Sequence, residues 1–176
     1  MTAAIDNTVL TLLLNPAAQP CPNPDTGKPA DHLESRILSL LDDMSDRKET
    51  LIIPTPALAE TLCCATPASQ IIARLREFAC LELVAFDQMS AIELSELIIG
   101  QKTDVKKIGS DATRPWQHLK MDLQIVAIAK AHGADRIITD DGPQSNFAKL
   151  AGLDVVHTWD IPLLGKYQHG DLFDEK

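Results

Sequence analysis

The chain has 176 residues, of which 45% are hydrophobic, 23% charged and only 4% aromatic. This length and composition predict one domain with an aliphatic core that forms without help from disulfide bonds. The apolar runs are too short to span a bilayer, and no basic region precedes the apolar residues at the N-terminus. We therefore expect neither a transmembrane helix nor a secretory signal.

The formal net charge of −9 argues against broad, non-specific affinity for nucleic acid, because such affinity depends on Lys and Arg contacts to phosphates. It does not exclude a nuclease, since a site built from carboxylates is itself acidic. The four cysteines lack the spacing of a zinc site, so we expect reduced thiols in a cytoplasmic protein.

Short apolar strands alternate with helices along the chain. Strands are expected at residues 2–6, 50–54, 81–86, 136–139 and 153–158. Helices are expected at 8–14, 33–44 with Asp31 as cap, from the Thr-Pro pairs at 55 and 66, at 90–100 with Asp87 as cap, at 116–132 and at 145–151. Residues 15–31 read as a long proline-rich loop. The alternation predicts an α/β domain over 1–165, with a parallel sheet covered on both faces and a polar tail at 166–176.

Acidic residues stand where the predicted strands end and where two helices begin. Asp6 ends the first strand, and Asp140 and Asp141 end the fourth; Glu60 and Asp122 lie early in two helices. Parallel sheets bind ligands at the carboxyl ends of their strands, which would bring these acids to one edge. Each acid also has a structural interpretation, as a helix cap, a partner of the helix dipole or a turn former.

Carboxylates that converge on one edge repel each other unless a cation lies between them. Oxygen ligands without His or Cys suit Mg²⁺ or Mn²⁺. Such ions activate water for attack on a phosphodiester and neutralise the charge that develops. The acids therefore predict a metal-dependent nuclease.

Three segments, "AIDNTVLTLLLNP", "IIPTPALAETL" and "KMDLQIVAIAKAHGADRIITDDGPQSNFAKLAGLDVV", resemble in order and spacing the blocks of the PIN-domain family. The resemblance covers nearly the whole chain and is strongest over 120–156. It implies a Rossmann-like three-layer α/β/α sandwich with a mostly parallel five-stranded sheet. It also implies a Mg²⁺- or Mn²⁺-dependent ribonuclease, a class that includes the toxin halves of VapBC-type toxin–antitoxin pairs.

The resemblance also assigns roles to individual residues. By analogy, the catalytic and metal-binding acids are Asp6, Glu60, Asp122 and Asp141, and Thr139 is a supporting hydroxyl.

The chain departs from the family pattern at two places. Thr8 follows Asn7, in the reverse of the usual order, although its hydroxyl is still available to a carboxylate or a metal-bound water. Phe147 lies six residues after Asp141 instead of three, so "GPQ" reads as an insertion. This shift leaves Asp140 as an alternative to Asp141.

The segment 102–120 is rich in basic residues and is interpreted either as a solvated linker or as an RNA-binding edge. The RNA-binding candidates are Lys102, Lys106, Lys107, Arg114, Trp116, His118 and Lys120.

Three functions are considered for an acidic α/β domain, and the sequence argues against the third. The leading hypothesis is a PIN-type endoribonuclease acting on RNA, with a possible antitoxin partner carrying a basic tail, a homodimeric state and no membrane association. The alternative is a non-catalytic PIN-like module that binds RNA or a protein. A haloacid dehalogenase-like phosphatase needs a second Asp two residues after the first, where this chain has Thr8.

Overall fold

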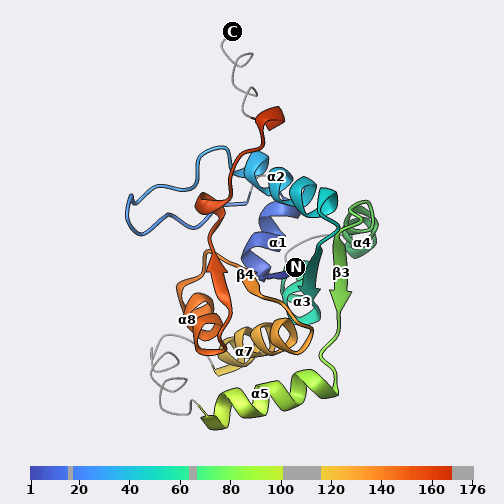
Figure 1. Cartoon of the computed structure of the whole chain (residues 1–176), viewed down its shortest axis with the longest axis vertical. Coiled ribbons are helices and arrows are strands. Elements are labelled where there is room, and N and C mark those ends of the chain that lie inside the picture. The colour runs from blue at the N-terminus through green and yellow to red at the C-terminus, as the bar shows by residue number, and fades with distance from the viewer. Residues whose placement is uncertain (16–17, 64–66, 101–115, 168–176) are drawn as a thin grey trace.

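Five parallel strands form one sheet in the order β3-β2-β1-β4-β5 (Figure 1). The computed structural model describes residues 1–15, 18–63, 67–100 and 116–167, with side chains from residue 119 onward in the last range. The strands are β1 (Thr2–Ile5), β2 (Thr50–Pro54), β3 (Leu81–Val84), β4 (Arg136–Ile138) and β5 (Asp154–Val156).

Helices cover both faces of this sheet. Their bounds are α1 (Asn7–Leu14), α2 (Leu33–Asp46), α3 (Thr55–Cys63), α4 (Ala68–Leu75), α5 (Gln88–Gly100), α7 (Trp116–Ala131) and α8 (Gly142–Leu150), followed by the 3₁₀ turns η1 (Thr158–Asp160) and η2 (Gly165–Tyr167). In Figure 1, α1 and α2 lie on one side of the strands, and α5, α7 and α8 lie on the other. Among the helices described, none is both long and apolar enough to cross a membrane.

The alternation of side chains along each strand divides the apolar residues between two cores. Ile5 and Leu51 face α1, α2 and α4, whereas Ala4 and Ile52 face α5, α7 and α8. Since both faces are buried, the strands are continuous apolar runs, as expected of a parallel sheet. The predicted three-layer α/β/α architecture is confirmed, and the sheet is parallel throughout.

The helix starts agree with the sequence in one case and differ in another. Asp87 accepts a hydrogen bond from Ser90 N–H at 2.8 Å, as a capping residue does. Asp31 was expected to cap α2, and this was wrong. His32 occupies the cap position with a φ of 50° and no side-chain hydrogen bond, while Asp31 is paired with Arg36 at 2.6 Å.

Arg36 on α2 connects three segments of the chain. Its Nε donates to Asp31 O at 2.8 Å, and its Nη1 donates to Trp159 O at 3.2 Å and to Ile161 O at 2.6 Å. The planar guanidinium has enough donors in fixed directions to satisfy all of these acceptors. Arg36 thereby holds the end of the 18–32 loop and the η1 region against α2.

The predicted boundary between a domain at 1–165 and a tail at 166–176 stays a prediction. Two residues of the expected tail contact α2 where they are described: Lys166 Nζ lies 2.6 Å from Asp42 Oδ2, and the Tyr167 hydroxyl donates to the same oxygen. Thr66, expected to begin α4, lies outside the described residues.

Candidate active site at the switch point of the sheet

The strand order changes direction between β1 and β4, which are neighbours in the sheet although β2 and β3 separate them in the sequence. Crevices for ligands form at such switch points, beyond the carboxyl ends of the strands. Ile5 pairs with Ile138, so Asp6 and Thr139 emerge side by side, and Asp6 N–H donates to Ile138 O at 3.3 Å. The first and fourth acidic positions of the sequence thus meet at this edge.

Asp6 lies at this edge of the sheet and is buried, since only 1% of its surface is exposed. It caps α1, because its Oδ1 accepts a hydrogen bond from Val9 N–H at 2.9 Å. Its Oδ2 accepts a hydrogen bond from Thr139 Oγ1 at 2.5 Å. The same Thr139 oxygen accepts a hydrogen bond from Asp141 N–H at 3.0 Å. The Thr139 hydroxyl therefore connects the carboxylate of Asp6 to the backbone of Asp141.

The surroundings of Asp6 disfavour its charge. Burial raises the pKa of Asp6 from 3.8 to about 7; the hydrogen bonds from Thr139 and Val9 oppose this, and the carboxylates of Asp141 and Asp140 add to it. A cation at this edge would relieve both the like-charge repulsion and the loss of solvation.

Asp140 and Asp141 follow each other in sequence but are held by different partners. Asp140 is buried, and its Oδ1 and Oδ2 accept hydrogen bonds from Thr158 N–H at 2.8 Å and from Thr158 Oγ1 at 2.6 Å. Burial raises the pKa of Asp140, and the bonds from Thr158 oppose that change. Both oxygens of Asp140 therefore connect β4 to the segment after β5.

Asp141 is half-buried and caps α8, since its Oδ1 accepts a hydrogen bond from Gln144 N–H at 2.8 Å. Residues 142–144, which read as an insertion in the sequence, form the first turn of this helix. Of the two neighbouring acids, Asp141 is the one turned toward the helix N-terminus, where backbone N–H groups and the helix dipole favour negative charge.

The backbone of α7 at Asp122 lies beside the start of α8. Asp122 is half-buried in a helix whose following residues, 123 and 125–129, are buried, as the all-apolar sequence predicted. Its carbonyl oxygen accepts a hydrogen bond from Gln144 Nε2 at 3.3 Å. Gln144 therefore contacts both acidic segments: its backbone N–H donates to Asp141, and its side chain donates to the backbone of Asp122.

Glu60 lies on α3, which packs against both α1 and α7. Thr61, the next residue, is 3.4 Å from Thr11 of α1 (Oγ1 to Oγ1). Both Glu60 and Thr8, which lies in the first turn of α1, are half-buried. The helix of Glu60 is thus a direct neighbour of the helix capped by Asp6.

The donor set fits a hard cation in its chemistry, because it consists of carboxylate and hydroxyl oxygens. As the side chains lie, however, the described residues contain no group of three or more His, Cys, Asp or Glu close enough to hold a metal ion. In particular, both oxygens of Asp6 already accept hydrogen bonds within the protein. A cation would have to draw the acids together.

Most of the predicted RNA-binding residues lie beyond what the structure describes. Lys102, Lys106, Lys107 and Arg114 fall in 101–115, and residues 116 and 118 are described only as backbone of α7. Lys120 is exposed.

Two residues near the acids were not predicted from the sequence. Cys21 of the proline-rich loop is half-buried; burial raises the pKa of its thiol, and the nearby carboxylates of Asp140, Asp141 and Asp6 raise it further. Gln144 was assigned to the insertion. Its position three residues after Asp141 and three residues before Phe147 is visible in the sequence, but its contact with α7 is not.

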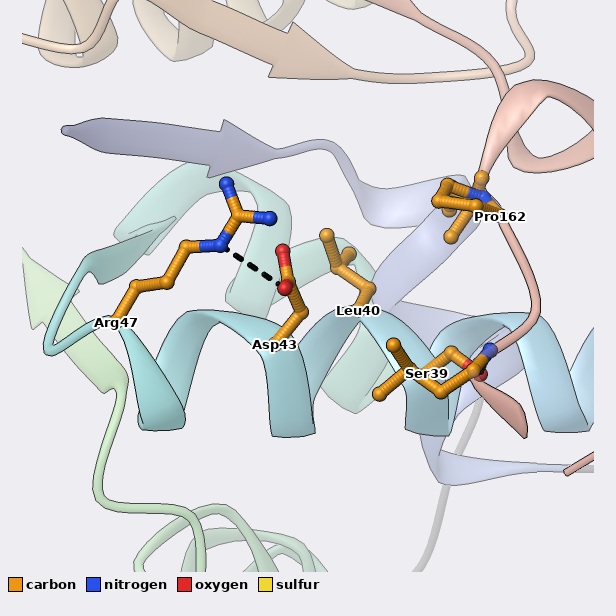
Figure 2. Close-up of a pocket in the computed structure, with 7 residues that line it drawn as sticks. Ser39, Leu40, Asp43, Arg47 and Pro162 are labelled. Atoms are coloured by element: carbon orange, nitrogen blue, oxygen red, sulfur yellow. Dashed lines mark hydrogen bonds and ion pairs between the residues drawn. The ribbon is translucent and has the colours of Figure 1, made fainter. Parts of the chain in front are cut away.

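A cavity of about 130 Å³ lies elsewhere, between α2 and the segment that leads away from η1 (Figure 2). Its wall includes the ion pair of Arg47 Nε with Asp43 Oδ1 at 2.9 Å, as well as Ser39 and Pro162. No candidate acid lines it, so it is separate from the switch-point edge.

The structure is an α/β protein with a five-stranded, all-parallel sheet flanked by helices, an architecture consistent with a PIN-like fold. A chain in the crystal structure of VapBC2 from Rickettsia felis, bound to a DNA fragment from their promoter, has a similar fold. The TM-score is 0.57 at 17% sequence identity, and the match covers 89% of this chain and 98% of that chain. No protein-family model and no curated protein sequence matches the chain.

Proposed function

We propose that this protein is a metal-dependent endoribonuclease of PIN type that hydrolyses RNA phosphodiester bonds. The observation that carries the proposal is the chain of contacts from Asp6 through Thr139 to Asp141 at the switch point of the sheet. Burial and repulsion by the neighbouring carboxylates destabilise the charged form of Asp6, which a bound cation would offset.

Asp6 and Asp141, with Asp122 and Glu60 from the flanking helices, would hold Mg²⁺ or Mn²⁺. When bound, the cation would activate water and balance the charge on the phosphate. Thr139 keeps the Asp6 carboxylate oriented by donating to Oδ2. Asp140 is occupied by Thr158 and has a supporting role in this scheme.

The test is cleavage of an end-labelled structured RNA in Mn²⁺, stopped by EDTA. Asp6→Asn should abolish cleavage, whereas Asp25→Asn, at an exposed loop position, should leave it intact. Cleavage by folded Asp6→Asn protein would refute the proposal.

A non-catalytic PIN-like module is the second candidate, and one observation favours it: the described acids do not form a ready group of three. Such a module would bind RNA or a protein without cleaving. In the same assay, binding of the RNA without Mn²⁺-dependent products would support it.

The VapBC2 neighbour, crystallised as a complex on promoter DNA, supports the further proposal that the chain is a cytoplasmic toxin with an antitoxin partner. The net charge of −9 favours a partner whose contacting segment carries Arg or Lys. Co-expression with the product of a neighbouring gene for a small basic protein, followed by co-purification, tests the pair.

A homodimer is also proposed. Of the six large hydrophobic side chains exposed in the described ranges, five belong to β3, α5 and the loop between them: Leu83, Phe86, Met89, Ile92 and Ile99. Apolar surface of this kind is more common at interfaces than on free monomers when it is contiguous.

A further inference from the structure

Gln144 touches the two acid-bearing segments at once. It is the third residue of α8 and is 1% exposed. Its backbone N–H donates to Asp141 Oδ1 at 2.8 Å, and its side-chain Nε2 donates to the carbonyl oxygen of Asp122 at 3.3 Å. Gln144 thus connects the start of α8 to the turn of α7 that contains Asp122.

The oxygen of the Gln144 side-chain amide makes no hydrogen bond in the described part of the fold. Gln144 Oε1 is buried and has no hydrogen-bond partner among the described residues. The assignment of the two amide atoms follows from the contact, since only the nitrogen can donate to a carbonyl. A buried acceptor without a donor is destabilising, and such atoms are rare enough to need an explanation.

We propose that Gln144 is a positioning residue of the divalent-cation site, an inference that rests on the function proposed above. Its Nε2 fixes the α7 backbone at Asp122 relative to the N-cap Asp141. Its Oε1 is an acceptor held ready for a water of the filled site. The outer partners of metal ligands act in this way and strongly affect metal affinity.

An amide suits this position better than a carboxylate. The charges of Asp140 and Asp141 already repel that of Asp6 at the edge. A glutamine supplies an acceptor without another negative charge, and its amide nitrogen donates to the carbonyl of Asp122 in α7.

The experiment is calorimetric titration of the full chain with Mn²⁺, beside thermal melting in EDTA. Gln144→Met keeps the length of the side chain but removes donor and acceptor. We expect Mn²⁺ binding 10- to 100-fold weaker, roughly the range for such partners, with an unchanged or higher melting temperature in EDTA. Gln70→Met, at an exposed position of α4, is the matched control and should change neither quantity. A purely structural glutamine predicts a lower melting temperature with unchanged affinity.

Gln144→Glu separates the acceptor from the rest of the side chain. It retains an acceptor oxygen but loses the Nε2 donor to Asp122 O and adds charge, so its Mn²⁺ affinity should be higher than that of Gln144→Met, and it should melt at a lower temperature than the wild type in EDTA. Loss of Mn²⁺ affinity equal to that of Gln144→Met would overturn the acceptor role.

The outcomes distinguish this inference from the proposed function. A wild type that shows no saturable Mn²⁺ binding refutes the metal-dependent function, and the role of Gln144 with it. A wild type that binds Mn²⁺, with Gln144→Met binding equally well, refutes the inference alone. Loss of cooperative melting in Gln144→Met also overturns it, because the side chain would then be needed by the metal-free fold.

Discussion

Asp6→Asn should stabilise the metal-free protein, and the gain should depend on pH. The carboxyl of Asp6 ionises near 3.8 in the unfolded chain and at about 7 in the folded protein. Between these values the folded state binds more protons than the unfolded state. The stability contributed by this group is therefore fully present below pH 3.8 and is lost as the pH rises to about 7.

The difference of about three pH units corresponds to about 4 kcal/mol of destabilisation above pH 7. Asparagine removes this term and keeps an acceptor for Val9 N–H, but it disturbs the bond from Thr139, at a cost of about 1 kcal/mol. We expect the free energy of unfolding of Asp6→Asn to exceed that of the wild type by about 3 kcal/mol at pH 8 and by about 1 kcal/mol at pH 5.

Urea unfolding in EDTA at pH 5, 6, 7 and 8, followed by circular dichroism, measures the difference. Asp25→Asn is the control and should follow the wild type at every pH. In saturating Mn²⁺ the order should reverse at pH 8, because a ligand stabilises the state that binds it. A difference between Asp6→Asn and wild type that stays constant from pH 5 to 8 would refute the account of Asp6.

Three further predictions concern the residues around the site. Thr158→Val removes one of the two donors to Asp140 and should lower the free energy of unfolding by about 1–3 kcal/mol, with Mn²⁺ affinity unchanged in titration calorimetry; weaker Mn²⁺ binding would make Asp140 a ligand. Arg36→Lys cannot satisfy all the acceptors of the guanidinium and should cost about 2 kcal/mol in urea unfolding; an unchanged midpoint would contradict the connecting role of Arg36. Met89→Lys should shift the sedimentation coefficient of a dimer to that of a monomer, and an unaltered dimer would place the interface elsewhere.

The layers of this fold were predictable because burial on both faces of a sheet leaves a direct trace in the sequence. Runs such as "TLIIP" have no polar alternation, as is typical of a parallel strand covered on both faces. Local caps were less reliable. Asp is a residue type that often caps helices, yet the carboxylate of Asp31 pairs with Arg36. The Arg36 guanidinium is oriented by carbonyls more than a hundred residues away in the chain.

The arrangement of the candidate site was predictable where it depends on strand ends and not where it depends on hydrogen-bond partners. Asp6 and Asp141 follow from the rule for parallel sheets once β1 and β4 are neighbours. The distinction between Asp140 and Asp141 rests on Thr158, eighteen residues later. The role proposed for Gln144 likewise depends on a carbonyl 22 residues earlier in the chain. The alternation of strands and helices along the sequence carries no information on such hydrogen-bonded pairs of distant residues.

Thr139 offers a test of whether the acidic edge works as a unit. Its hydroxyl donates to Asp6 Oδ2 and accepts from Asp141 N–H, so Thr139→Val breaks both contacts while keeping the shape of the side chain. The bond to Thr139 lowers the pKa of Asp6, and its loss should raise that pKa further above the ordinary range. Mn²⁺ must compete with the proton on Asp6, so the affinity should be weaker at pH 7 and should recover at higher pH, whereas Thr139→Ser should restore the wild-type profile. Titrations with Mn²⁺ from pH 6 to 9 measure this; a Thr139→Val profile parallel to that of the wild type would mean that the threonine only supports the fold.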